Sequence, residues 1–171
     1  MSGAVVWIFG LPSAGKSTLA GILAGLLGAG GAAVLLLDGD EVRLALDPAP
    51  GFDEASRAAF YRTLAGLAAL AARQGIVAIV AATSNRRVHR EEARNRWPDL
   101  LEIFVDVPIE ECERRDTKGL YAKARRGEAP SLPGVGDPFE RPERPNLRAA
   151  GGDDPVVAAE VLRRLRAIGA A

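Results

Sequence analysis

The sequence predicts an α/β fold, a three-layer sandwich in which a central parallel sheet carries helices on both faces. Two observations predict it. Short apolar runs, typical of strands buried on both faces, alternate along the chain with longer segments of helical periodicity. Polar or glycine-rich clusters follow the first three of these runs. Strands that alternate with helices form βαβ units, and their right-handed crossovers produce a parallel sheet.

The expected elements follow from this pattern in chain order. Strands are expected at residues 5–9, 33–37, 76–81 and 101–107, the second of them buried like the first. Helices are expected at residues 17–27, 54–73, 88–97 and 109–115, with a last one after Asp154, which can cap it.

Helical periodicity also selects the faces that should be buried. In the helix at 54–73 the predicted core face is Phe60, Leu64, Leu67, Ala68 and Ala71. In the last helix it is Val157, Val161, Leu165 and Ile168. We expect Trp7 and Trp97 to pack, Cys112 to be buried, and the single histidine, His89, to be a solvated helix residue.

Composition narrows the class of protein. The 171 residues fit a single domain, residues 1–171, and Lys plus Arg equals Asp plus Glu at 22 each, which gives no basic excess for nucleic acid. No apolar run approaches the roughly 20 residues of a membrane span. The N-terminus has no basic start or cleavage site, so we expect no signal peptide. One cysteine allows no intrachain disulfide and fits the reducing cytoplasm.

Residues 118–147 differ from the rest of the chain. They are dense in Gly, Pro and charge and contain few core-forming side chains. An irregular segment of this length inside a compact domain is typically a functional lid or a disordered stretch. We interpret it as a mobile lid that orders around ligands, with one short helix near residues 121–126.

Residues 10–17 carry the clearest chemical motif. They read Gly-Leu-Pro-Ser-Ala-Gly-Lys-Ser, which matches the phosphate loop Gly-x4-Gly-Lys-Ser, and they lie between an expected strand and an expected helix. Backbone N–H groups of such a loop cradle phosphates at the positive end of the helix dipole. Lys16 is expected to reach the β- and γ-phosphates, and Ser17 to hold Mg²⁺. The predicted ATP-binding residues here are Gly10, Ser13, Ala14, Gly15, Lys16, Ser17 and Thr18.

Two carboxylates follow the second expected strand. Asp38 and Asp40 should lie at the same sheet edge as the phosphate loop, because ligands of parallel sheets bind at the carboxyl ends of the strands. One of them would accept the proton of the acceptor hydroxyl or position the metal. The alternative is that Asp38-Gly39 is a simple turn. Arg43, one turn onward, either binds an anionic acceptor or lies on a solvated helix face.

With the phosphate loop in place, further motifs show a family resemblance. They are Leu37-Asp38-Gly39-Asp40, Val42-Arg43, Gly51-Phe52, Arg57, Val105-Asp106-Val107-Pro108, Lys118-Gly119-Leu120-Tyr121 and Asp137-Pro138-Phe139-Glu140. In this order they resemble adenylylsulfate (APS) kinase, a P-loop NTPase-type kinase, over roughly residues 4–147. The stretch from Lys118 to Tyr121 is far more specific than the phosphate loop.

The resemblance implies a reaction, a cofactor and a set of site residues. It implies that ATP phosphorylates the ribose 3′-hydroxyl of APS, with Mg²⁺, a five-stranded sheet, a lid and commonly a homodimer. Asp38 and Asp40 would serve the metal and the acceptor hydroxyl, with Asp38 orienting or deprotonating that hydroxyl, and Arg115 would pack on the ATP base. The implied acceptor-binding residues are Asp40, Arg43, Phe52, Arg57, Phe60, Ser84, Lys118 and Leu132.

The chain departs from the family pattern mainly on the acceptor side. Ser84-Asn85-Arg86 stands where Ser-Pro-Tyr is usual, Phe60 replaces an asparagine, and Leu132 replaces the aromatic that faces Phe52. A second interpretation is therefore a kinase of the same architecture with another small acceptor, such as a sugar, an antibiotic or a modified nucleotide. A third is a nucleotide-binding switch without turnover, which the absence of the guanine motif Asn-Lys-x-Asp disfavours.

Overall fold

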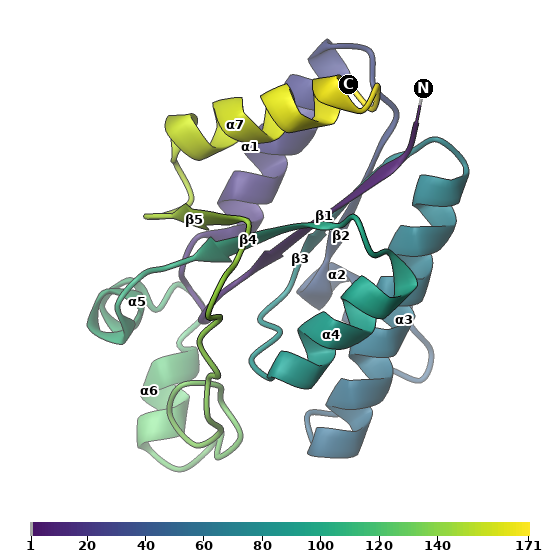
Figure 1. The fold of residues 1–171 in the computed structure, drawn as a ribbon. Coiled ribbons are helices and arrows are strands. Elements are labelled where there is room, and N and C mark those ends of the chain that lie inside the picture. Colours follow the sequence, from purple (N-terminus) through teal and green to yellow (C-terminus); the bar gives the residue numbers. More distant parts are fainter. Residues whose placement is uncertain (1) are drawn as a thin grey trace.

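The computed structural model describes residues 2–171, which form a five-stranded sheet with the strand order β2-β3-β1-β4-β5 (Figure 1). The strands are β1 Ala4–Phe9, β2 Val34–Asp38, β3 Val77–Ala81, β4 Leu101–Val105 and β5 Leu147–Ala149. Each neighbouring pair runs parallel, so the carboxyl ends of the strands meet at one edge. The α/β class and the parallel sheet are confirmed.

The helices cover both faces of this sheet. They are α1 Lys16–Ala29, α2 Gly39–Ala45, α3 Glu54–Arg73, α4 Arg87–Arg96, α5 Ile109–Arg115, α6 Leu120–Arg125 and α7 Pro155–Ala167. Figure 1 shows α1 and α7 on one side and α3 and α4 on the other. Side chains alternate between the two cores along β1: Val6 and Ile8 pack with α1 and α7, whereas Trp7 and Phe9 pack with α3.

The expected strands and helices lie within a few residues of those observed. Three burial predictions are wrong. β2 was expected to be buried, but it is the edge strand, and Leu35 and Leu36 are 37% and 38% exposed. Leu67 lies at the margin of the apolar face of α3 and is exposed. Ile168 follows the last residue of α7 and is also exposed, because the helix ends one residue before it.

Two elements had no clear signal in the sequence. α2 has seven residues and β5 has three, and β5 includes the exposed Arg148. Elements this short span two periods or fewer, so an apolar pattern has too few repeats to be recognised. In the segment at 118–147, several side chains nevertheless join the core, namely Tyr121, Ala124 and Leu132.

His89 corrects another expectation. It was expected to be solvated, but it is only 4% exposed and stacks on Tyr61 with ring centroids 4.2 Å apart. Its Nδ1 has no hydrogen-bond partner among residues 2–171. Burial, followed by the nearby charge of Arg57, lowers the pKa of His89 to about 4, so the ring is neutral at pH 7. A neutral, stacked histidine serves the core between α3 and α4.

The buried carboxylate of Glu102 on β4 generates the first prediction. Glu102 is 2% exposed and forms an ion pair with Arg94 of α4. Removing one partner of a buried pair leaves an uncompensated charge, so Arg94→Ala should lower the free energy of unfolding by about 2–3 kcal/mol. Arg96→Ala, on the same helix with the exposed partner Glu92, should cost less than about 0.5 kcal/mol. Urea unfolding measures both, and equal losses would contradict the assignment.

Candidate active site

The phosphate loop joins β1 to α1 and depends on glycines at two close contacts. A Cβ on Gly10 would lie 2.7 Å from the carbonyl oxygen of Val105, and one on Gly15 would lie 2.6 Å from the backbone nitrogen of Gly152. Gly15 also has φ +104°, a value that favours glycine. No side chain of residues 2–171 caps the first turn of α1, so its N–H groups remain available to an anion.

Lys16 begins α1 and points back into the loop. Its Nζ donates a hydrogen bond to the carbonyl oxygen of Leu11 at 2.7 Å. Burial lowers the pKa of Lys16 to about 8, against the opposing influence of Asp40 and Asp38. Burial disfavours the charged form of this ammonium group. A bound phosphate would stabilise that charged form, because it supplies the missing anionic partner.

Asp38 ends β2 and faces the phosphate loop. One carboxylate oxygen accepts a hydrogen bond from the Asp40 backbone N–H at 3.0 Å, which caps α2, and the other accepts one from the Ser17 hydroxyl. This contact brings two oxygen ligands together. Within residues 2–171 no group of three or more His, Cys, Asp or Glu could form a closed metal site. Mg²⁺ is usually held by one or two carboxylates plus substrate phosphates, so Ser17 and Asp38 fit that ion.

Residues 118–147, the predicted lid, contact the phosphate loop and Asp40. Lys118 forms an ion pair with Asp40, and this hydrogen bond raises the pKa of Lys118. Asp116 accepts hydrogen bonds from the N–H groups of Tyr121 and Ala122, at 3.0 and 3.1 Å, and so fixes the start of α6. The hydroxyl of Tyr121 donates to the carbonyl oxygen of Pro12 in the phosphate loop at 2.9 Å. The Lys118–Tyr121 motif thus joins the lid directly to the loop.

Arg43 lies between two aromatic rings at the acceptor side. Its guanidinium carbon is 4.0 Å from the ring centroid of Phe60 and 4.5 Å from that of Phe52. Phe60 is buried on α3, whereas Phe52 is 59% exposed. Arg43 also donates to the carbonyl oxygens of Pro50 and Gly51, at 3.1 and 2.9 Å, and burial lowers its pKa. Phe60, which replaces an amide, supports this guanidinium through its ring face.

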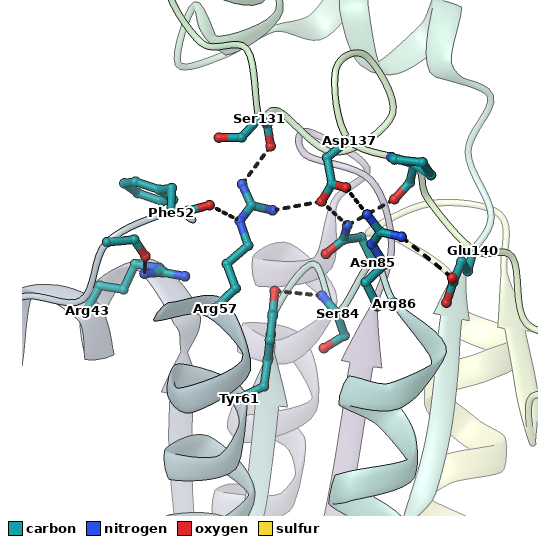
Figure 2. Close-up of polar contacts among 12 residues, drawn as sticks. Arg43, Phe52, Arg57, Tyr61, Ser84, Asn85, Arg86, Ser131, Asp137 and Glu140 are labelled. Carbon is teal, nitrogen blue, oxygen red and sulfur yellow. Dashed lines mark hydrogen bonds and ion pairs between the residues drawn. The ribbon is translucent and has the colours of Figure 1, made fainter. Parts of the chain in front are cut away.

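Arg57 is the buried arginine of α3 and joins two loops (Figure 2). Its Nε donates to the carbonyl oxygen of Phe52 and its Nη2 to that of Ser131 in the lid, both at 2.7 Å. Nη1 lies 3.7 Å from Asp137 Oδ2. These residues border a cleft of about 250 Å³, together with Arg86 and His89. The cleft lies between the start of α3 and residues 118–147, and its charged lining is mixed, with Arg57 and Arg86 beside Asp53, Glu54 and Asp137.

Three other expected site residues have partners of their own in the structure, and their predicted roles stay predictions. Ser84 is fully buried; its hydroxyl accepts a hydrogen bond from Trp7 Nε1 at 3.0 Å, and its N–H donates to the Tyr61 hydroxyl at 2.9 Å. Leu132 is buried in the core on the α1 side, and it shares no core cluster with the exposed Phe52. Arg115 pairs with Glu111, at 3.0 Å, on the same helix.

Sequence reasoning missed the polar residues that surround Arg57 in this structure. Asn85, Arg86 and Asp137 were noted as parts of motifs, but no role was assigned to them. In the structure they form one network between the end of β3 and the lid (Figure 2). Asp137 lies 52 residues from Asn85 and 51 from Arg86 in the chain, so no local spacing could have paired them.

The fold and this loop define a P-loop nucleotide-binding protein of the kinase type: the phosphate loop follows β1, and a carboxylate at the end of β2 contacts its serine. No helix within residues 2–171 combines the length and apolar character needed to cross a bilayer.

Comparisons with known proteins place the chain more narrowly. A family model described as adenylylsulphate kinase matches residues 2–150. The adenylyl-sulfate kinase of Picosynechococcus sp. is 44% identical over 145 residues, covering 85% of this chain and 82% of that protein. That of Deinococcus deserti is 46% identical over 146 residues, covering 85% and 81%. This chain belongs to the adenylylsulphate kinase family.

A solved structure agrees with the family membership. The Mycobacterium tuberculosis APS kinase, in complex with AMPPNP and APS, superposes with a TM-score of 0.90 at 39% identity. The match covers 96% of this chain and 98% of that one. The similarity therefore extends over the sheet, the phosphate loop and the lid segment alike.

The lowered pKa of Lys16 generates a stability prediction. The unfolded chain binds this proton up to pH 10.5 and the native state only up to about pH 8, so burying the charged lysine destabilises the fold at pH 7. Lys16→Met should therefore raise the free energy of unfolding at pH 7 by roughly 1–3 kcal/mol.

The advantage of Lys16→Met over the parent should shrink between pH 8 and 10.5, because the native lysine loses its proton there. Urea unfolding at pH 7 and pH 10 measures it. Lys123→Met, at an exposed position of α6, is the control and should shift stability by less than about 0.5 kcal/mol. A parent that is more stable than Lys16→Met at pH 7 would refute the prediction.

Proposed function

We propose that this chain is an adenylyl-sulfate kinase, which transfers the γ-phosphoryl group of ATP to the 3′-hydroxyl of adenylyl sulfate (APS) and yields PAPS. One observation carries the proposal: the contact of Asp38 with Ser17 and the ion pair of Asp40 with Lys118 join phosphate loop, acids and lid at one sheet edge. Relatives named for this activity match 85% of the chain, which supports the choice of acceptor.

The chain's own groups supply most of the chemistry. The N–H groups at the start of α1 and the ammonium group of Lys16 would bind the β- and γ-phosphates and stabilise the charge that develops during transfer. Lys16 would leave the carbonyl oxygen of Leu11 to do so. Ser17 and Asp38 would hold Mg²⁺, which when bound neutralises part of the phosphate charge.

The acceptor would enter from the side of Arg43 and Arg57. We assign Asp40 or Asp38 to orient and deprotonate its hydroxyl, because both lie at the carboxyl end of β2 beside the loop. Phe52, being exposed and flanked by both arginines, offers its ring to the adenine of APS. Closure of residues 118–147 would exclude water, so that ATP is not simply hydrolysed.

We also infer the domain organisation, oligomeric state and compartment of the chain. We take residues 1–171 as one kinase domain that works without nucleic acid, which the zero net charge supports. The exposed Leu35 and Leu36 on edge strand β2 support association of two copies into a homodimer. A single, buried cysteine is compatible with the reducing cytoplasm.

A coupled ADP-release assay tests the function. We expect rapid turnover with ATP and APS and none with a panel of sugars and other nucleotides. Lys16→Ala should lower turnover by about 10²–10³-fold, because transition-state charge loses its main cation, while circular dichroism shows an intact fold. Turnover with a sugar and silence with APS would instead identify a kinase of the same fold with another acceptor.

Arg57→Ala should separate the two substrates. It removes a buried, charged donor from the acceptor side, so the KM for APS should rise by about 10–100-fold while the KM for ATP changes less than about twofold. Arg62→Ala, at an exposed position of the same helix, is the control. Initial rates over a grid of both substrates measure this. An equal rise in both KM values would place Arg57 outside the acceptor site.

A further inference from the structure

The carboxylate of Asp137 lies among three donors at the edge of the acceptor cleft. Arg86 Nη2 donates to Asp137 Oδ1, and Asn85 Nδ2 donates to Oδ2 at 2.6 Å (Figure 2). Arg57 Nη1 is 3.7 Å from Oδ2, which is too long for a hydrogen bond. The lid carboxylate is therefore held by the residues at the start of α4, although the buried Arg57 lies within reach.

Arg57 is held in place by neutral groups. Its two hydrogen bonds go to the carbonyl oxygens of Phe52 and Ser131, which fix the direction of the guanidinium, while the ion pair with Asp137 at 3.7 Å offsets only part of its charge. A carboxylate in direct contact would do the opposite, because a bidentate carboxylate would occupy the same donors that a phosphate or sulfate needs. The position of Asp137 thus determines how much charge Arg57 offers to the cleft.

The lid is docked here by several contacts besides Arg86. Asn85 Nδ2 also donates to the carbonyl oxygen of Pro138 at 2.9 Å. The backbone N–H of Glu140 donates to the carbonyl oxygen of Asn85 at 2.8 Å. Arg90 adds a hydrogen bond to the carbonyl oxygen of Glu140 at 2.8 Å. Because none of these contacts involves Arg86, loss of its guanidinium would release Asp137 Oδ1, while Asn85 still holds Oδ2 and residues 118–147 stay docked.

We propose that Arg86 is a positioning residue that binds Asp137 Oδ1, keeps this carboxylate from forming a direct hydrogen bond with Arg57, and so leaves the Arg57 donors open to the anionic phosphosulfate group of the acceptor. The proposal rests on the proposed function for the place of the acceptor. Arg86 acts through Asp137 and not by touching the acceptor. Without it, Asp137 would shorten its existing ion pair with Arg57 to a direct hydrogen bond and compete with the incoming anion.

A double-mutant cycle on the full chain distinguishes this role from direct contact. Arg86→Ala should raise the KM for APS about tenfold, the usual scale for one competing charged pair, with kcat and the KM for ATP within about twofold. Arg86→Ala combined with Asp137→Asn should return the KM for APS to within about threefold of the parent, since no carboxylate remains to compete.

Arg87→Ala is the matched control. It removes a neighbouring arginine and its exposed ion pair with Glu143, yet leaves Asp137 untouched, so the KM for APS should stay within about twofold. An unchanged KM in Arg86→Ala would overturn the proposal. So would a double variant as impaired as Arg86→Ala alone, because Arg86 would then contact the acceptor or merely dock the lid.

A second readout does not depend on the acceptor. Inorganic sulfate should raise the thermal unfolding midpoint of the parent more than that of Arg57→Ala, and the difference reports the anion affinity of Arg57. In Arg86→Ala, sulfate should raise the unfolding midpoint by little more than in Arg57→Ala. In Arg86→Ala combined with Asp137→Asn, the rise should return to nearly that of the parent. A parent inactive with APS would contradict the proposed function alone, whereas full sulfate stabilisation in Arg86→Ala would overturn the role of Arg86.

Discussion

The site depends on one constraint of topology: β3 lies between β1 and β2 in the sheet. The phosphate loop and Asp38 therefore sit two strand spacings apart, about 9–10 Å, at the same sheet edge. That gap is wide enough for phosphate groups and narrow enough for the Ser17 hydroxyl to reach the Asp38 carboxylate. The parallel register of both strands with β3 fixes the gap, because the core on either side leaves the backbone little freedom.

The lid is held at both sides of this gap by contacts of different kinds. On the phosphate side, Tyr121 is buried and hydrogen-bonded to the loop itself. On the side of Arg57, the contacts are made by polar side chains. Lys118 forms an ion pair with Asp40, Arg57 donates to the carbonyl oxygen of Ser131, and Arg86 donates to the carboxylate of Asp137. Buried aromatic contacts persist, whereas partly exposed polar ones exchange with water and ligand.

Much of this could be predicted from the sequence. The phosphate loop and Asp38 follow strands with clear apolar patterns, so their meeting at one edge follows from the parallel sheet alone. The environment of Ser84 could not be foreseen, because its partner Trp7 lies 77 residues away and reads as an ordinary core residue. The core that Leu132 joins could not be foreseen either, because apolar side chains in an irregular segment show no period that identifies their core.

The same limit applies to the network around Arg57. Its members are ordinary polar residues. Their contacts depend on the conformation of residues 118–147, which the spacing of residues in the sequence does not predict. What the sequence does carry is the pairing of a loop serine with an acid across the gap. The binding of AMPPNP, titrated calorimetrically with and without magnesium, tests that pairing most directly. Magnesium should tighten binding to the parent and have little effect on Asp38→Asn; an equal gain in both would contradict the account.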